Sequence, residues 1–338
     1  MSEANSVLDW LLNSDPAIRW QVLRDLVHAP ADIVSQERAK IAEPSRAREQ
    51  ADLRPGEKNP PPESWGARLL ALQGSDGQWD GGACFPANYY DKPDTEPGQP
   101  WTSTLPVLQL LYEFGIDPNS QRVRHAIELV RDNCRWEHAG QPFFSGEVEP
   151  CINGRVVTLG TYFGQEVTPI VDRLLGEQLD DGGWNCEAER GSTRSSFHTT
   201  INVLEGLLAY EKAKGQTPKL QKARHRAEEY LRERKLLHRK STGEIIDKNW
   251  KTFSFPVRWF YDILRALDYF RQANRHDPRL EEAIAILKSK QQPDGTWLLE
   301  NPHPGKVPFE LEDANQPSRW NTFRALRILE WHEKSAVL

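Results

Sequence analysis

The residue types best suited to chemistry lie near the middle of the chain. Glu149 and Cys151 begin one apolar helical stretch, His198 begins the next, and Cys186 lies shortly before His198. Carboxylate oxygen, thiolate and imidazole are accepted zinc ligands, and a zinc ion with one open position can bind and deprotonate a thiol or water. A plainer interpretation stays open: free cysteines are commonly small buried hydrophobes, and His198 is then a helix N-terminal residue with a satisfied hydrogen bond.

Two further polar residues interrupt apolar stretches that we expect to be helices. Asp262 and Asn321 each lie close to a tryptophan. A carboxylate on a cavity wall can act as an acid, a base or a stabiliser of a cation, so Asp262 is the candidate catalytic residue. The alternative is a network between helices with Arg258 or Arg319. No catalytic triad, phosphate loop or nucleophile elbow is present, so no nucleotide cofactor is expected.

Tryptophan is unusually frequent, with twelve tryptophans against one methionine. Large rigid rings either fill a core or line a cavity, and their faces stabilise cationic carbon as well as enclosing an apolar chain. Packing between helices is the alternative for each ring. The candidates for lining a ligand cavity lie at or near the starts of apolar helices: Trp20, Trp101, Tyr162, Phe197, Trp259, Tyr261, Trp320 and Asn321.

Composition excludes several classes of protein. The formal charge of −6 argues against a nucleic-acid partner, and we interpret the basic run from Lys219 to Lys240 as the outer face of a solvated helix. No stretch is apolar for the roughly 18 residues of a transmembrane helix. The N-terminal residues lack a leader pattern, and four irregularly spaced cysteines do not form a disulfide framework. These features predict a cytoplasmic protein.

A pattern of four residues, Gln-x-x-Asp-Gly-x-Trp, occurs three times, at 73–79, 178–184 and 291–297. Each copy follows an amphipathic stretch and precedes a more apolar helix, while strand signals are nearly absent. We expect an all-α fold of about six helical hairpins in one domain over 1–338, closed into a ring whose inner helices line a central cavity. Pro-rich insertions interrupt it near 43–63 and 82–100. The inner helices are expected to start near Ile18, Trp101, Cys151, Phe197, Arg258 and Arg319.

The repeated turns resemble the QW motifs of squalene and terpene cyclases, whose α/α toroid is shared by protein prenyltransferase β-subunits. The resemblance implies that each glutamine caps the start of a neighbouring helix and that each tryptophan, Trp79, Trp184 and Trp297, stacks against it. The Asp-x-Asp-Asp acid motif of squalene cyclases and the Asp-Asp-x-x-Asp magnesium motif are both absent. The one Asp-Asp pair, Asp180-Asp181, lies in a repeated turn. Cyclisation of squalene through such a motif is therefore not expected.

The prenyltransferase β-subunits hold one zinc through an Asp-x-Cys pair at the start of one inner helix and a histidine at the start of the next. Glu149-x-Cys151 and His198 match this placement, with glutamate in place of aspartate, and Cys186 is a further candidate ligand. The resemblance implies a zinc-dependent transferase or cyclase with an apolar isoprenoid-type ligand and a partner subunit.

Two other functions stay open. One is a non-catalytic toroid that binds lipids or proteins, which the missing acid motifs favour. The other is a polysaccharide-active α/α barrel, which requires a pair of inward carboxylates. The sequence offers few inward acids, so the barrel is the weakest of the three.

Overall fold

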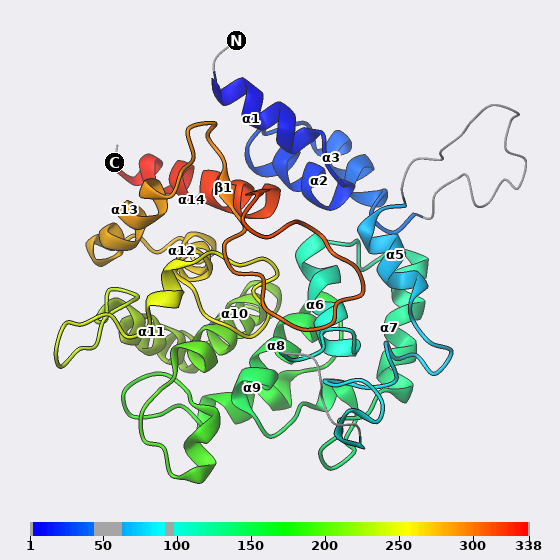
Figure 1. The fold of residues 1–338 in the computed structure, drawn as a ribbon. Coiled ribbons are helices and arrows are strands. Elements are labelled where there is room, and N and C mark those ends of the chain that lie inside the picture. The colour runs from blue at the N-terminus through cyan, green and yellow to red at the C-terminus, as the bar shows by residue number, and fades with distance from the viewer. Residues whose placement is uncertain (1–2, 44–62, 92–97, 337–338) are drawn as a thin grey trace, which may run out of the picture. The chain divides into compact units, whose positions relative to one another are not determined.

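The computed structural model describes residues 3–43, 63–91 and 98–336, and within them the fold is all-α (Figure 1). The only strands in these ranges are β1 (Trp297–Leu298) and β2 (Pro317–Ser318), which pair antiparallel. The predicted insertion near 43–63 lies outside the described residues except at its two ends. None of the described helices is long and apolar enough to cross a membrane.

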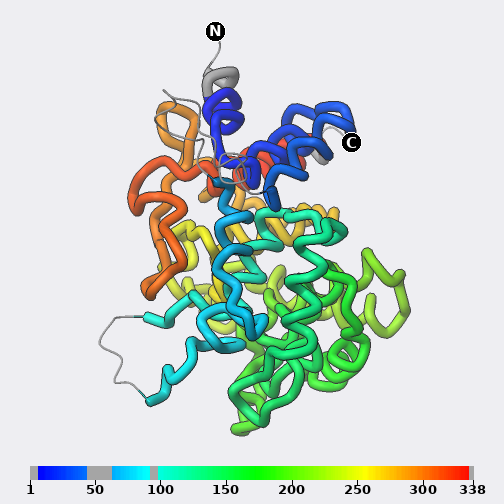
Figure 2. Tube along the Cα trace, turned by 90° about the vertical axis from the view of Figure 1, so that its right-hand side faces the viewer, coloured from blue at the N-terminus to red at the C-terminus, as the bar shows by residue number. Residues whose placement is uncertain are grey.

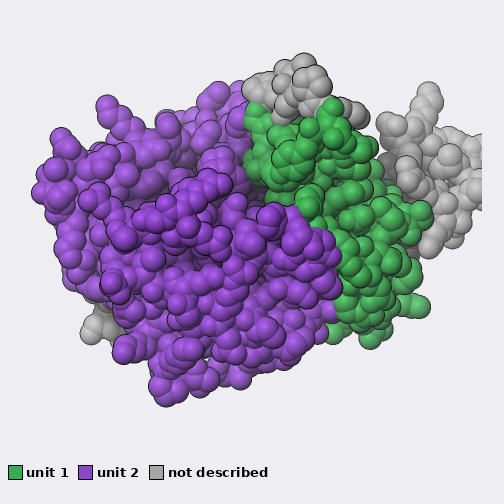
Figure 3. All heavy atoms as spheres, turned by 90° about the horizontal axis from the view of Figure 1, so that it is seen from below, with its two compact units in different colours: residues 1–137, 305–309 green, residues 138–304, 310–338 purple. Residues whose placement is uncertain are grey.

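The chain divides into two compact units, coloured separately in Figure 3. The first comprises Met1–Glu137 and Gly305–Phe309, and the second comprises His138–Pro304 and Glu310–Leu338. The organisation as one domain, the closure into a ring and the central cavity stay predictions.

In the first unit most side chains of α6 are buried, whereas α7, which follows it in the chain, buries one apolar face. The segment 305–309 returns to this unit, where Lys306 accepts a backbone hydrogen bond from Trp101 (2.7 Å) and the Phe309 ring lies under the Arg68 guanidinium (3.6 Å). Its elements are α1 (Glu3–Leu12), α2 (Pro16–Asp25), α3 (Ala31–Ala39), α5 (Trp65–Ala71), η1 (Tyr89–Asp91), α6 (Thr104–Phe114) and α7 (Gln121–Asn133).

The second unit alternates strongly buried helices with amphipathic ones. In α8, α10 and α12 most side chains are buried, whereas α9 and α13 bury one face only, as the sequence pattern predicts. Its elements are η2 (Phe143–Ser145), α8 (Pro150–Tyr162), α9 (Thr168–Gly176), η3 (Cys186–Arg190), α10 (Phe197–Lys214), α11 (Pro218–Arg232), η4 (Lys248–Lys251), α12 (Ile263–Gln272), η5 (Pro278–Leu280), α13 (Glu281–Ser289) and α14 (Arg319–Ala336).

Helices α8 and α10 lie side by side in close contact, in green in Figures 1 and 2. Glycines make this approach possible. A Cβ at Gly154 would lie 2.5 Å from the Asn202 carbonyl oxygen, and one at Gly206 would lie 2.3 Å from the Gly154 carbonyl oxygen. Because backbone meets backbone there, neither position has room for a larger side chain. The crossing fixes the N-terminal ends of both helices, which carry the candidate site.

The three repeated turns share one geometry, illustrated by the second. Trp184 is fully buried, and its indole Nε1 donates to the Leu174 carbonyl oxygen at the end of the preceding helix α9 (2.7 Å). Gly182 adopts φ +101°, a region that favours glycine. Indole bonds of the same kind, Trp79 to Leu69 and Trp297 to Leu287, measure 2.7 and 2.8 Å. The turns therefore fasten consecutive helices together.

The glutamines of these turns act differently from the expected helix caps. Gln178 Nε2 donates to the Gly182 carbonyl within its own turn and to the Ala223 carbonyl inside α11, both at 2.7 Å. Gln73 bridges its own turn and the Ala126 carbonyl inside α7 in the same way. Gln73 and Gln178 thus join their turns to the middle of the next amphipathic helix instead of capping that helix's start. Gln291 Nε2, in the third turn, donates to the Gly295 carbonyl of its own turn (3.4 Å).

The predicted start of α12 is wrong, and the predicted start of α6 is three residues early. Helix α6 begins at Thr104, so Trp101 lies in the preceding loop, and α12 begins at Ile263 and not at Arg258. The segment before α12 is not helical: Arg258 adopts φ +55° in a turn, which an α-helix does not allow, and Asp262 is extended and caps α12. Trp259 and Tyr261 therefore come from a loop, where their backbone groups are free to bond elsewhere.

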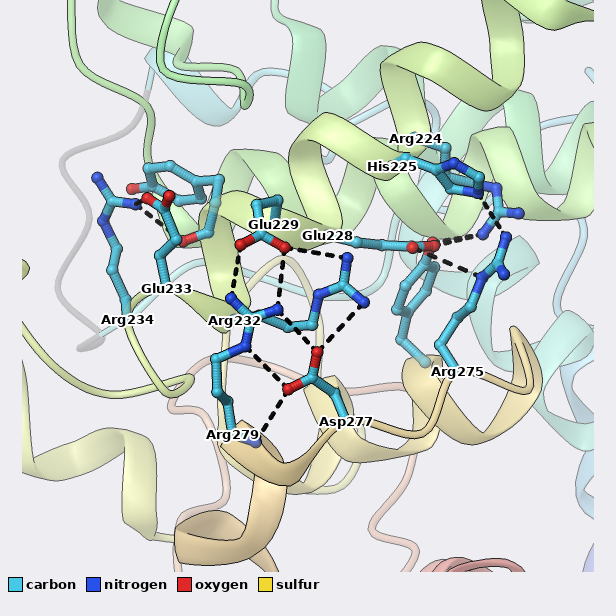
Figure 4. Close-up of polar contacts among 12 residues, drawn as sticks. Arg224, His225, Glu228, Glu229, Arg232, Glu233, Arg234, Arg275, Asp277 and Arg279 are labelled. Atoms are coloured by element: carbon cyan, nitrogen blue, oxygen red, sulfur yellow. Dashed lines mark hydrogen bonds and ion pairs between the residues drawn. The ribbon is translucent and has the colours of Figure 1, made fainter. Parts of the chain in front are cut away.

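Carboxylates lie next to the arginines on and around α11. Figure 4 shows these side chains, which come from several elements. Arg224 is 2 % exposed and bonds Glu211 and Glu228, while Arg279 forms a forked pair with Glu229. The prediction of a solvated outer face is therefore right for one side of α11 only. Its other side carries buried ion pairs that connect it to Glu211 of α10, and hydrogen bonds with the Tyr269 hydroxyl connect it to α12.

Candidate metal centre and aromatic cluster

Three of the four predicted metal ligands come together in the second unit. The Glu149 carboxylate and the Cys151 and Cys186 sulfurs all lie within 4.8 Å of one another. The two sulfurs are 2.8 Å apart, and Cys151 Sγ lies 3.4 Å from Glu149 Oε2. Two soft sulfur donors with one carboxylate oxygen form a set that suits zinc and leaves one tetrahedral position open. We refer to these three residues as the thiol–carboxylate cluster.

The start of α8 positions the first two members of the cluster. Pro150 occupies the first turn, and Glu149 takes the N-cap position, yet its side chain makes no capping bond. The chain entering the helix is held by the buried Asn153, which accepts from the Glu147 amide and donates to the Glu147 carbonyl, both at 2.7 Å. Glu149 is exposed and Cys151 is partly exposed. The Glu149 carboxylate therefore contacts the Cys151 thiol instead of capping the amides of α8.

The 3₁₀ segment η3 supplies the third member. Asn185 caps it by accepting from the Glu187 amide (3.0 Å) and closes the following loop by donating to the Arg194 carbonyl (2.7 Å). The Cys186 sulfur lies 3.4 Å from the Thr199 hydroxyl in the first turn of α10. Cys186 thus lies between the start of α8 and the start of α10.

The two thiols differ in acidity. The hydrogen-bonded contact with Cys186 raises the pKa of Cys151 well above its usual range, with burial and the Glu149 carboxylate adding to the effect. The same contact lowers the pKa of Cys186, and Thr199 assists. Zinc binds thiolates, so ligation by both sulfurs requires displacement of the proton that Cys151 retains.

His198, the fourth predicted ligand, is held apart from the cluster. Among the described residues, the group of mutually close ligand atoms contains Glu149, Cys151 and Cys186 and no His198 nitrogen. Its Nδ1 lies 2.8 Å from the Tyr261 amide nitrogen, so Nδ1 accepts that bond and Nε2 carries the proton. Burial lowers the pKa of His198 to about 4, and the nearby Arg265 charge contributes. His198 is therefore neutral around pH 7.

Around His198 lies a cluster of aromatic rings. Trp259 and Phe260 are stacked with ring centroids 3.9 Å apart, and His303 stacks on Phe260 at 4.0 Å. The His198 ring meets the edges of Trp259 at 5.5 Å and of Trp250 at 5.9 Å. Trp259, Phe260 and His303 are each partly exposed, so the stack offers ring surface to an apolar ligand. We refer to these five residues as the aromatic cluster.

A buried polar network holds the aromatic cluster rigid. Asn202 donates to the carbonyls of His198 (2.7 Å) and Trp259 (2.9 Å). Arg265, 2 % exposed, bonds the Asn202 side chain at 2.9 Å and forms a forked pair with Glu205 at 2.8 and 2.6 Å. Because Asn202 and Arg265 are buried and the bonds to Glu205 are charge-assisted, the backbone that carries the rings is pre-organised.

The candidate catalytic residue, Asp262, has a structural partner. Its Oδ1 accepts from the Arg265 amide at 2.7 Å as the N-cap of α12, and it is 3 % exposed. Burial raises its pKa, while Arg324 and the Arg265 amide act in the opposite direction. Arg324 and Arg265 are thus charged groups that act on Asp262, and a network with Arg258 or Arg319 stays a prediction. A role for Asp262 in catalysis stays a prediction.

The other predicted cavity residues divide into two groups. Phe197 and Tyr261 pack against Trp250, with centroids 4.6 and 4.9 Å from it, and so lie behind the aromatic cluster. The remaining five lie elsewhere. Two of them form hydrogen bonds: Trp20 Nε1 donates to the Phe114 carbonyl (2.8 Å), and Asn321 donates to the Leu298 carbonyl (3.0 Å). Tyr162 packs on Phe163 (ring centroids 5.0 Å apart), Trp320 stacks on Phe255 (4.2 Å), and Trp101 is buried with 1 % of its surface exposed.

Several contributors were missed from the sequence: Thr199, Asn202, Glu205, Trp250, Phe260, Arg265 and His303. Charged residues such as Glu205 and Arg265 inside apolar helical stretches are one signal that was available. His303 gave none, because it lies in a loop between the third turn and α14.

Comparison with known proteins gives a distant similarity. No family model matches the chain, and no curated protein matches it. Among solved structures, an arginine-to-alanine variant of the type II terpene cyclase MstE from Scytonema, in complex with geranylgeranyl dihydroxybenzoate as substrate, aligns over 69 % of this chain and 73 % of its own. The TM-score is 0.33 and the identity is 16 %.

Proposed function

We propose that this chain is a zinc-binding protein that acts on a ligand with an apolar, isoprenoid-type group. Glu149, Cys151 and Cys186 hold the metal, and the aromatic cluster receives the apolar group. The observation that carries the proposal is the convergence of two thiols and one carboxylate within 4.8 Å. A zinc ion with an open position lowers the pKa of a bound thiol or water, which makes either a nucleophile near pH 7.

The chain's own residues have distinct roles in this proposal. The Glu149 side chain makes no capping hydrogen bond to α8, so its carboxylate can face a cation. Thr199 lies beside the Cys186 sulfur and orients it through a contact of 3.4 Å. Trp259 and Phe260 offer stacked faces that enclose an apolar chain and stabilise positive charge on carbon. A transferase or a cyclase acting on isoprenoids would use both features, and binding without turnover would use the aromatic faces alone.

The apolar ligand can be tested by calorimetric titration of the full chain with farnesyl diphosphate. We expect Trp259→Ala to weaken binding by about ten-fold, the effect of losing one stacked ring of roughly 1.4 kcal/mol. The matched control is Trp331→Ala, which removes a tryptophan that stacks on His276. Equal affinity for the parent and Trp259→Ala would contradict this part of the proposal. Binding with no turnover would favour the lipid-binding alternative.

A further inference from the structure

Cys151 and Cys186 are arranged for a second reaction that does not require a metal. Their sulfurs lie 2.8 Å apart. Two sulfurs on one tetrahedral zinc, each about 2.3 Å from it, are about 3.8 Å apart. A disulfide bond measures about 2.05 Å. The observed distance between the two sulfurs is thus shorter than in a zinc site and longer than in a disulfide. A small movement of the sulfurs is enough to reach either arrangement.

The surroundings favour oxidation at this pair and nowhere else among the cysteines. Cys151 and Cys186 are partly exposed, whereas Cys84 and Cys134 are buried at 7 % and 0 % exposure. Cys186 belongs to the short segment η3, which ends at Arg190 and is capped by Gly191 with φ +93°. A short 3₁₀ segment on the surface can adjust its position more easily than the body of a packed helix.

We propose that Cys151 and Cys186 form a reversible disulfide on reaction with a hydroperoxide. One sulfur, as thiolate, attacks a peroxide oxygen; the O–O bond breaks, and water or an alcohol leaves with a sulfenic acid formed. The second sulfur attacks the sulfenic sulfur; the S–S bond forms, the S–O bond breaks, and water leaves. Two electrons pass from the sulfurs to the peroxide. The disulfide cannot ligate zinc through thiolates. This loss of zinc binding rests on the proposed function, whereas formation of the disulfide is independent of it.

The test is a thiol count on the full chain, reduced, stripped of metal with a chelator and exposed to hydrogen peroxide. Of the four cysteines, two should remain free, with the Cys151 and Cys186 peptides cross-linked and with all four thiols restored by dithiothreitol. Cys186→Ser should abolish the cross-link, and Cys84→Ser should retain it as the matched control. Oxidation of either cysteine to a sulfinic acid without a cross-link, or four unchanged thiols, would overturn the proposal. Because no metal is present, such a failure would leave the zinc proposal standing.

Discussion

His198 should make folding stability depend on pH in a window that the structure defines. Burial lowers its pKa to about 4 in the folded chain, against an ordinary value of 6.5 that applies after unfolding. Between these two values the unfolded chain binds a proton that the folded chain does not. Stability is therefore complete above about pH 6.5 and is lost as the pH falls towards 4.

The magnitude follows from that window. At pH 5 the unfolded chain is about 1.5 pH units below the histidine's ordinary pKa, which corresponds to about 2 kcal/mol at 1.36 kcal/mol per unit. Solvent at the partly exposed ring reduces this to about 1 kcal/mol. The physical cause is visible in the contacts, since a proton on Nδ1 would break the 2.8 Å bond from the Tyr261 amide and place a charge near Arg265.

Urea unfolding of chelator-treated protein at pH 7 and pH 5 measures this effect. His198→Asn retains an acceptor for the Tyr261 amide but has no ionisable group, so its loss of stability between the two pH values should be smaller than the parent's by about 1 kcal/mol. His125→Asn, which replaces an exposed histidine on α7, is the matched control and should follow the parent. An equal pH dependence in the parent and His198→Asn would refute the reasoning.

Two other predictions concern the repeated turns. Trp184→Phe removes the indole donor to the buried Leu174 carbonyl and should lower the free energy of unfolding by about 1–3 kcal/mol in urea titrations, and an unchanged midpoint would contradict the fastening role. Gly182→Ala would place a Cβ 2.6 Å from the Arg226 carbonyl oxygen at φ +101°, whereas Gly191→Ala, at φ +93° with nothing within 4 Å, meets backbone strain alone. The first should therefore lower the melting temperature by several degrees more than the second, and equal losses would argue against close packing of the turn on α11.

The fold was largely predictable because its signals are local and repeated. Apolar periodicity gave the all-α class and the starts of α2, α8, α10 and α14 to within a few residues. The start of α12 was not predictable in the same way. Its preceding segment is as apolar as a helix, and the contacts that hold it out of helical geometry come from residues distant in sequence. The Tyr261 amide bonds His198, and the Trp259 carbonyl bonds Asn202.

The candidate site was predictable in its residue types but not in its grouping. Glu149, Cys151 and Cys186 were expected together, and they meet. His198 was expected to join them, but its ring faces Tyr261 and the aromatic cluster. The Tyr261 amide donates to this ring from a segment that the sequence pattern predicts as helix and that is a loop in the structure. Whether a ring nitrogen faces a metal or an amide depends on such loop contacts, which spacing along one helix cannot reveal.

Zinc binding by the metal-stripped, reduced protein, measured by elemental analysis after removal of free metal, tests whether Glu149, Cys151 and Cys186 hold a metal. We expect about one zinc per chain, retained by the His198→Asn and Cys84→Ser variants and lost from Cys151→Ser and Cys186→Ser. Binding should weaken at lower pH because the Cys151 proton must leave. A well-folded parent that binds no zinc, or variants of Cys151 and Cys186 that bind as the parent does, would contradict the zinc proposal.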